Sequence, residues 1–263
     1  MSQAIRFTVF SKPWKTMPLP ELAAHIAGLG FTGVEFPIRP EFQVEPENIT
    51  AGLPEAARIF ADHGVAIESI AGPTDEMTIA ACAEVGVPII RICLPIGPEG
   101  YLATEARYRR EFAELAPTLE QHGVAVGIQN HCNNQVGSCL GVMRLIAEYP
   151  PEQFCMVWDA AHNVLAGEIP EQAIDICRSH LRMVNLKSPW WMRANGFESA
   201  RAEWRMMWTT GRQGIAPWPR VVEQLKARDW SGPVCLTAEY SDHGAVDRAV
   251  ADDLAYAREL FEG

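Results

Sequence analysis

Polar side chains that can move protons or bind cations follow short apolar stretches at five places in this 263-residue chain. They are Glu35, the run Gln129-Asn130-His131, Asp159 with His162 three residues on, Asn185 with Lys187, and Glu239. Carboxylates, imidazoles and amines act as acids and bases, and carboxylate or amide oxygens bind hard cations. A buried acid is costly without a partner. The pattern therefore predicts one site that collects these side chains from several strands.

The apolar stretches that carry these residues alternate with longer helical patterns along the whole chain. Predicted strands span 5–10, 33–37, 65–70, 89–94, 124–129, 155–159, 182–187 and 234–239. Predicted helices, with apolar residues at three-to-four spacing, span 19–29, 54–63, 104–122, 142–149, 171–180, 219–228 and 245–261. Strands that alternate with helices pair in parallel, because a parallel connection needs a crossover element.

Eight such units in 263 residues predict an α/β fold, a (β/α)8 barrel that forms a single domain over residues 1–263. A doubly wound sheet is the alternative. In the barrel, the reactive side chains would lie where the strands end, at one mouth. The long connection 188–214 follows the seventh strand and contains four tryptophans, and we expect a short amphipathic helix in its middle.

Composition excludes several classes of partner and of site. Lysine and arginine number 22 against 33 acidic residues, a net charge of −11, and no segregated basic face offsets it, so nucleic acid and anionic membranes are not expected partners. The seven cysteines are scattered, which argues against a disulfide framework and a structural zinc site. Without a signal peptide or a membrane span, we expect a cytoplasmic protein; a homo-oligomer stays possible.

Five segments resemble the xylose isomerase-like TIM-barrel superfamily of sugar-phosphate isomerases and epimerases. They are GFTGVEF at the second strand, VAVGIQNH at the fifth, VWDAAH at the sixth, VNLKS at the seventh and LTAEY at the eighth. Their order and spacing extend the resemblance over essentially the whole chain. In this family, Glu, Asp, His and Glu from strands five to eight typically hold a divalent metal, and the two glutamates also act as acid and base.

Carried over by position, the resemblance implies a metal quartet of Gln129, Asp159, Asn185 and Glu239. Two ligands differ from the family pattern, since amides replace one glutamate and the histidine. Amide oxygens still bind hard cations, so Mg²⁺, Mn²⁺ or Ca²⁺ is possible, but with fewer carboxylates binding should be weaker and zinc is disfavoured. The sequence leaves open whether a metal binds at all.

The missing glutamate also limits the chemistry. Two-base epimerisation needs a proton acceptor on each face of the substrate, and an amide has no useful basicity at neutral pH. Glu239 is therefore the expected base, with His131, His162 or Lys187 as the source of a second proton. Lys187 could equally pair with a carboxylate, and Asp159 could equally cap the helix that follows it.

Other residues are candidates for substrate binding. Glu35 could bind a substrate hydroxyl or form a buried ion pair, and His131 could contact substrate or be structural. Trp190 and Trp191 could stack on a sugar ring, pack the long connection or contact another subunit.

The main hypothesis is an enzyme that isomerises or epimerises a small sugar-like polyol, keto-sugar or keto-acid by proton transfer next to a carbonyl. A lyase or dehydratase acting on a keto-sugar or keto-inositol fits a single glutamate at least as well. A catalytically silent carbohydrate-binding barrel is the third alternative. A DNA-repair endonuclease is disfavoured by the negative charge and by the missing histidine-rich metal set.

Overall fold

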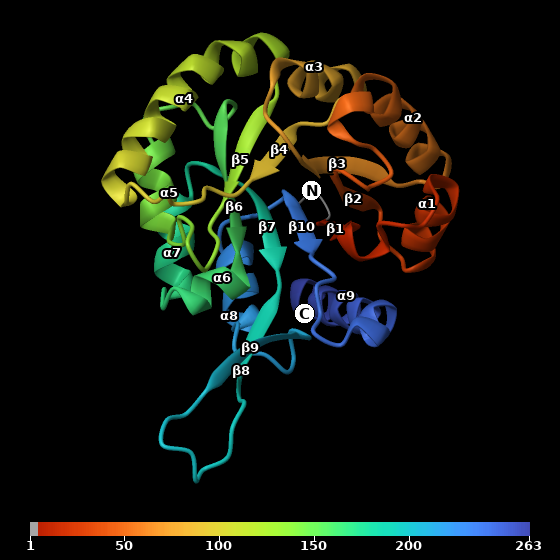
Figure 1. Ribbon diagram of the computed structural model, residues 1–263. Helices are drawn as coiled ribbons and strands as arrows, with labels where there is room; N and C mark the ends of the chain where they lie inside the picture. The colour runs from red at the N-terminus through yellow and green to blue at the C-terminus, as the bar shows by residue number, and fades with distance from the viewer. Residues whose placement is uncertain (1–4) are drawn as a thin grey trace.

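Eight parallel strands close into a barrel in the computed structural model, which describes residues 5–263 (Figure 1). The neighbours around the barrel run β1-β10-β7-β6-β5-β4-β3-β2. The strands are β1 (Arg6–Phe10), β2 (Gly33–Pro37), β3 (Ala66–Ala71), β4 (Ile89–Ile92), β5 (Ala125–Gln129), β6 (Phe154–Asp159), β7 (Leu181–Leu186) and β10 (Pro233–Leu236). The predicted (β/α)8 fold and all eight predicted strand positions are confirmed.

Helices lie outside the strands and cover them (Figure 1). They are α1 (Leu19–Gly28), α2 (Ile49–Asp62), α3 (Glu76–Val85), α4 (Tyr101–His122), α5 (Cys139–Ile146), α6 (Ala160–Leu165), α7 (Pro170–Cys177), α8 (Trp218–Lys226) and α9 (Val246–Glu262). Short 3₁₀ turns follow β1, β2 and β10, at Lys12–Trp14, Pro46–Asn48 and His243–Ala245. None of the described helices is both long and apolar enough to cross a membrane.

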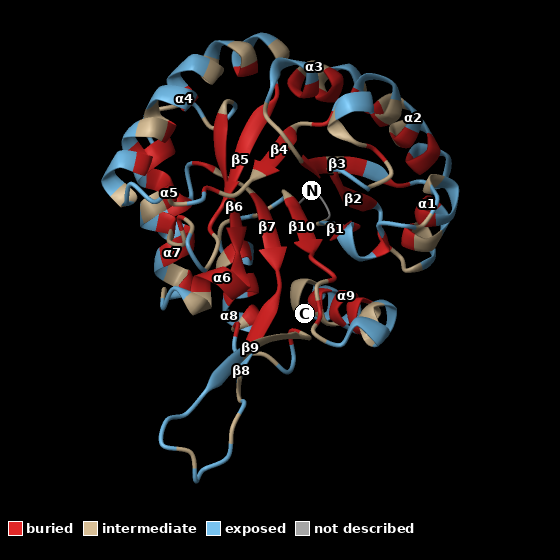
Figure 2. Cartoon of the chain, in the orientation of Figure 1, coloured by how far each residue is buried: buried red, intermediate tan, exposed pale blue. Residues whose placement is uncertain are grey.

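The period of two along each strand decides which side chains enter the barrel. One set of alternate residues packs against the helices in the main core, and a smaller cluster of the opposite parity includes Phe10, Ile89, Cys155, Met183 and Cys235. Successive side chains point to opposite faces of a strand. Residues two or four positions after these inner ones therefore also face the barrel axis, now at its carboxyl end. Figure 2 shows the strands as the most buried part of the chain.

Two helices, α3 and α6, lie outside the helical spans predicted from apolar spacing, although a helix capped by Asp159 was one of the alternatives for that residue. Asp75 caps α3 by accepting from the backbone N–H of Thr78, and Gly86 ends it with a φ of 74°. Asp159 caps α6 by accepting from the N–H groups of Ala161 and His162. The side-chain oxygen satisfies helix N–H groups that have no partner within the helix.

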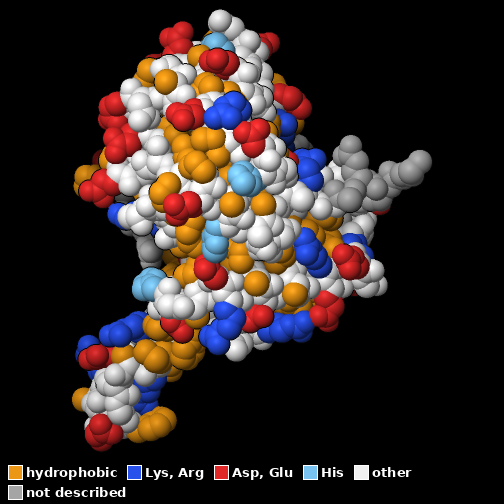
Figure 3. All heavy atoms as spheres, turned by 90° about the vertical axis from the view of Figure 1, so that its right-hand side faces the viewer, with side chains coloured by type: hydrophobic (Ala, Val, Ile, Leu, Met, Phe, Trp, Pro, Cys, Tyr) orange, Lys and Arg blue, Asp and Glu red, His pale blue; other side chains and the backbone are white. Residues whose placement is uncertain are grey.

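The long connection after β7 forms an antiparallel hairpin, so the predicted amphipathic helix in its middle is wrong. Strand β8 (Ser188–Arg193) pairs with β9 (Trp204–Thr209), and Ser188 lies opposite Thr209. The hairpin projects away from the barrel and carries a patch of hydrophobic side chains (Figures 1 and 3). Trp191 is 50% exposed and Trp204 is 60% exposed. A helix would need local contacts, whereas this segment gains its hydrogen bonds from pairing across the loop.

Candidate active site

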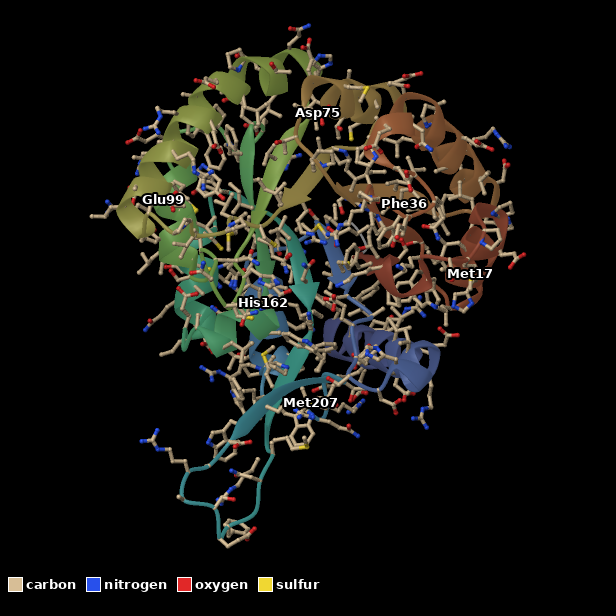
Figure 4. The ribbon with its side chains drawn as sticks, in the orientation of Figure 1. Met17, Phe36, Asp75, Glu99, His162 and Met207 are labelled. Carbon is tan, nitrogen blue, oxygen red and sulfur yellow. The ribbon has the colours of Figure 1, made fainter. Side chains whose placement is uncertain are left out.

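The carboxyl ends of the strands surround a cavity of about 140 Å³. Its lining comes from seven of the eight strands or the residues just after them, and comprises Phe10, Lys12, Arg39, Arg91, Cys93, Gln129, His131, His162, Asn185, Thr237 and Glu239. Strand ends thus collect the polar side chains at one mouth, as the strand-end argument predicts. Figure 4 labels His162 near the middle of the molecule, beside the end of β6.

A buried chain of charged and amide groups crosses the floor of this cavity. Arg91 Nε donates to Glu35 Oε1 at 2.6 Å and Arg91 Nη2 donates to Glu35 Oε2 at 3.1 Å. Its third nitrogen, Nη1, donates to Gln129 Oε1 at 2.8 Å, and Gln129 Nε2 donates to Asp159 Oδ2 at 2.8 Å. The four residues of this network, Glu35, Arg91, Gln129 and Asp159, are each less than 9% exposed. This arrangement fixes the amide orientation of Gln129 and neutralises Glu35.

Glu239 lies beside two ammonium groups at the rim. Lys187 Nζ donates to its Oε2 at 2.6 Å, and Lys12 Nζ donates to its Oε1. Burial alone would raise the pKa of Glu239, but Lys187 and Lys12 together outweigh burial and lower the pKa to about 2. The carboxylate is therefore ionised at neutral pH. Ala238, which directly precedes it, has a φ of 51°, an uncommon backbone conformation for a residue other than glycine.

The root of the hairpin forms one wall of the site. Lys187 Nζ lies 3.6 Å from the centroid of the Trp208 ring, a cation–π contact. The backbone N–H of Trp208 donates to Ser241 Oγ at 2.8 Å, which ties β9 to the segment after Glu239. The position of Lys187 therefore depends on the hairpin as well as on β7.

His131 and His162 lie in contact beside this wall, with ring centroids 3.9 Å apart and ring planes tilted by 35°. Burial lowers the pKa of His131 and lowers that of His162 to about 4, so both imidazoles are neutral at pH 7. His162 Nδ1 accepts from the backbone N–H of Cys132 at 3.3 Å, which leaves the ring proton on Nε2. That Nε2 is buried without a hydrogen-bond partner among the described residues, and so is Asn185 Oδ1. Both residues line the cavity, and a ligand hydroxyl could satisfy either atom.

The quartet implied by the family resemblance does not fit a divalent cation in this arrangement. Gln129 Oε1 already accepts from Arg91, and both carboxylate oxygens of Glu239 hold a lysine ammonium. These positive groups repel a metal ion from the same oxygens. Of the four expected ligands, only Asn185 presents an unpartnered buried oxygen in the part of the chain that the structure describes.

A different group could hold a metal ion. His131, Cys132 and His162 each offer one ligand atom, and these three atoms lie within 4.8 Å of one another. His131 Nδ1 faces the Cys132 carbonyl at 3.0 Å, which frees its Nε2 for a ligand. Burial raises the pKa of the Cys132 thiol, which opposes the thiolate that a metal prefers.

The structure brings most of the predicted site residues together, but not all. Gln129, His131, His162, Asn185 and Glu239 line the cavity, Lys187 joins through Glu239, and Asp159 joins through Gln129. Glu35 forms the buried ion pair that was its alternative interpretation, and its carboxylate is not part of the cavity lining. Trp190 and Trp191 lie on the hairpin outside the cavity, where Trp191 and Trp204 line a separate apolar hollow.

The sequence patterns missed several residues of the site, among them Lys12, Arg39, Arg91 and Trp208. Arg91 carried a usable signal, because a charge inside the apolar run Ile89-Ile90-Arg91-Ile92 at the inward-facing parity is costly without a partner. Lys12, two residues after the first strand, lies at an equivalent strand end. No local pattern marks Arg39 or Trp208.

A family model described as the xylose isomerase-like TIM barrel matches residues 23–260 of the chain. No curated protein sequence matches the chain.

Several solved structures share the fold at low sequence identity. A D-psicose 3-epimerase with D-fructose has a TM-score of 0.73 and 14% identity, over 98% of this chain and 100% of that one. The 3-keto-D-glucoside 4-epimerase YcjR from E. coli has a TM-score of 0.73 and 16% identity, over 97% and 100% of the two chains. The probable 3-DHS dehydratase AsbF from Bacillus anthracis has a TM-score of 0.68 and 14% identity, over 95% and 98%.

Proposed function

We propose, from the premise that this chain belongs to the xylose isomerase-like TIM-barrel family, that it is an isomerase or epimerase that moves a proton next to the carbonyl of a small sugar-like substrate. The observation that carries this proposal is the ionised Glu239 carboxylate at the cavity, with Lys12 and Lys187 in contact with it. The epimerases of the same fold act on sugars, which supports a sugar-like substrate.

In the proposed step, Glu239 takes a proton from the carbon next to the carbonyl. The C–H bonding electrons form a carbon–carbon double bond, and the carbonyl electrons move onto its oxygen. The ammonium groups of Lys187 and Lys12 stabilise that oxygen, as fixed positive groups do for a developing oxyanion. Return of the proton from Glu239 to the former carbonyl carbon completes an isomerisation when the hydroxyl proton on the first carbon also passes to the former carbonyl oxygen, which makes the first carbon the new carbonyl. Return of a proton to the first carbon from its other face, an epimerisation, needs a second donor.

Positive side chains thus take the electrostatic role that a metal has in the family. When a substrate oxygen engages Lys187 or Lys12, that lysine interacts less with Glu239, so the pKa of the carboxylate should rise toward a value useful for a base. Neutral His162 donates through Nε2–H and Asn185 accepts through Oδ1, and these two groups orient the substrate hydroxyls.

A dehydratase is the second candidate, and the amide at Gln129 favours it. Arg91 fixes that amide where the family has a second glutamate, so among residues 5–263 Glu239 is the one carboxylate in the cavity lining. A single base suffices to remove a proton next to a carbonyl, and Lys187 could protonate the hydroxyl that leaves. A silent barrel closed by a direct Gln129–Glu239 hydrogen bond is not what the structure shows, since Gln129 bonds to Arg91 and Asp159.

Solvent exchange tests the proposal. Incubating the protein in D2O with a panel of ketoses, keto-sugars and keto-acids should place one deuterium on the carbon next to a carbonyl, as read by NMR or mass spectrometry. Loss of water to an enone, seen by ultraviolet absorption, would identify the dehydratase instead. If neither exchange nor dehydration occurs with any compound of the panel while ligand binding is intact, the result would support the silent barrel.

Metal removal gives a further prediction. Because the oxygens of Gln129 and Glu239 already contact protein cations, dialysis against EDTA should leave the exchange rate within about twofold of the untreated protein. Atomic emission on the same samples reports whether a metal was present and removed. A large loss that added metal restores would contradict the prediction, and a Cys132→Ser variant would then test the His131–Cys132–His162 group.

A further inference from the structure

The cavity is positively charged, although the chain as a whole carries a net charge of −11. Four cationic side chains, Lys12, Arg39, Arg91 and Lys187, line the cavity or contact groups that line it. They face three carboxylates, Glu35, Asp159 and Glu239. The cluster therefore carries one net positive charge.

Three of the four cations already have partners. Arg91 uses all three of its nitrogens on Glu35 and Gln129, and Lys12 and Lys187 share the two oxygens of Glu239. The third carboxylate, Asp159, is satisfied by Gln129 and by two backbone N–H groups. The excess charge is therefore located on Arg39.

Arg39 has no ion pair and no side-chain hydrogen bond within residues 5–263. It is half-buried in the loop after β2, and its guanidinium lies 5.6 Å from the centroid of the Phe10 ring, while that of Arg91 lies 4.8 Å from the same ring. Burial and then the charge of Arg91 lower the pKa of Arg39 by more than Glu35, Cys93 and Glu239 raise it, although an arginine stays protonated at neutral pH. A half-buried guanidinium beside a second guanidinium is unfavourable without a counterion.

We propose that Arg39 binds a carboxylate of the substrate, so that the ligand of this cavity is a sugar acid or a keto-acid rather than a neutral sugar. The inference rests on the proposed function, because it assigns the substrate class of the same cavity. A planar guanidinium binds a carboxylate through two parallel hydrogen bonds. A phosphate monoester carries about −1.5 to −2 at pH 7, more than the single excess charge here. The hydroxyls of the ligand would reach His162 Nε2 and Asn185 Oδ1.

Calorimetric titration with a matched pair of ligands tests this inference. D-gluconate and D-sorbitol have the same carbon chain and differ in one carboxylate, and neither has a carbonyl to react. We expect gluconate to bind roughly tenfold to hundredfold more tightly than sorbitol, which is the effect of one charge-assisted pair. Added salt should weaken gluconate binding and leave sorbitol binding unchanged.

Arg39→Gln should remove the preference for gluconate, and Arg39→Lys should keep part of it. The matched control is Arg58→Gln on α2, where an exposed arginine pairs with Asp62, and this variant should bind both ligands like the parent. Equal affinity of the parent for gluconate and sorbitol would overturn the inference, as would an Arg39→Gln variant that keeps the preference. Tighter binding of sorbitol 6-phosphate than of gluconate would also overturn it and assign a phosphate.

The anion site at Arg39 and the proton transfer by Glu239 can be rejected independently of each other. Binding of gluconate is measured without turnover, so a gluconate preference without deuterium exchange on any carbonyl substrate would leave the anion site standing and reject the proton transfer. Exchange on neutral ketoses alone, with no preference for gluconate, would support the proton transfer and reject the anion site.

Discussion

Replacing Glu239 with glutamine should lower the rate of deuterium exchange by roughly 10²- to 10⁴-fold, the usual contribution of a general base. The amide keeps the size of the side chain but cannot accept the proton. The same change leaves Lys12 and the buried Lys187 without their shared counterion, so circular dichroism and thermal melting must show that the variant is folded. Ligand binding by the variant should persist, because Arg39, His162 and Asn185 are unchanged.

The control for this variant is Glu41→Gln. Glu41 also pairs with a lysine, Lys15, at 3.3 Å, but its side chain is 81% exposed and does not line the cavity. This variant should exchange at the parental rate. An exchange rate for Glu239→Gln within a few-fold of the parent would show that another group is the base.

The pKa of Glu239 also sets a pH dependence of stability that the same variant can isolate. Its folded pKa of about 2 lies below the ordinary value of 4.5, so the ionised carboxylate stabilises the folded state above pH 4.5. This contribution is lost as the pH falls from 4.5 toward 2. We expect the parent to lose roughly 3 kcal/mol more than Glu239→Gln over that range, measured by urea unfolding.

Strand positions and the mouth of the barrel could be predicted because they depend on patterns within one segment. The apolar runs that end in Gln129, Asp159 and Asn185 mark both a buried strand and its functional end. The hairpin could not be predicted, since β8 and β9 gain their hydrogen bonds only by pairing with each other. Trp204, Met206 and Trp208 alternate along β9, but the surrounding tryptophans and methionines hide that period.

The contacts between side chains inside the site could not be predicted from the sequence either. Glu35 and Arg91 lie on β2 and β4, which are not neighbours in the barrel, and they meet because both face its axis. Lys12 contacts Glu239 across 227 residues of sequence and Lys187 contacts it across 52. Sequence spacing gives the strand end at which a side chain lies, but not which charge it contacts. Those contacts pair the oxygens of Gln129 and Glu239 with protein cations.

The buried pair between Arg91 and Glu35 leads to the largest expected effect on stability. Arg91→Met removes the guanidinium and leaves the carboxylate of Glu35, which is fully buried, without a counterion. Breaking such a pair on one side costs about 3–5 kcal/mol. For a chain of this size we expect the melting temperature to fall by roughly 10 °C, with a matching loss in the free energy of unfolding measured in urea.

A double variant separates the loss of a charge partner from the loss of packing. In Glu35→Gln with Arg91→Met the remaining buried group is a neutral amide, so the pair should recover a large part of the stability that Arg91→Met alone loses. Arg58→Met, the same substitution at the exposed pair with Asp62, should change the melting temperature little, since exposed ion pairs contribute little. If Arg91→Met alone were about as stable as the parent, Glu35 would have to be protonated or reached by water, and the barrel floor would not be the closed ion-pair network that orients Gln129.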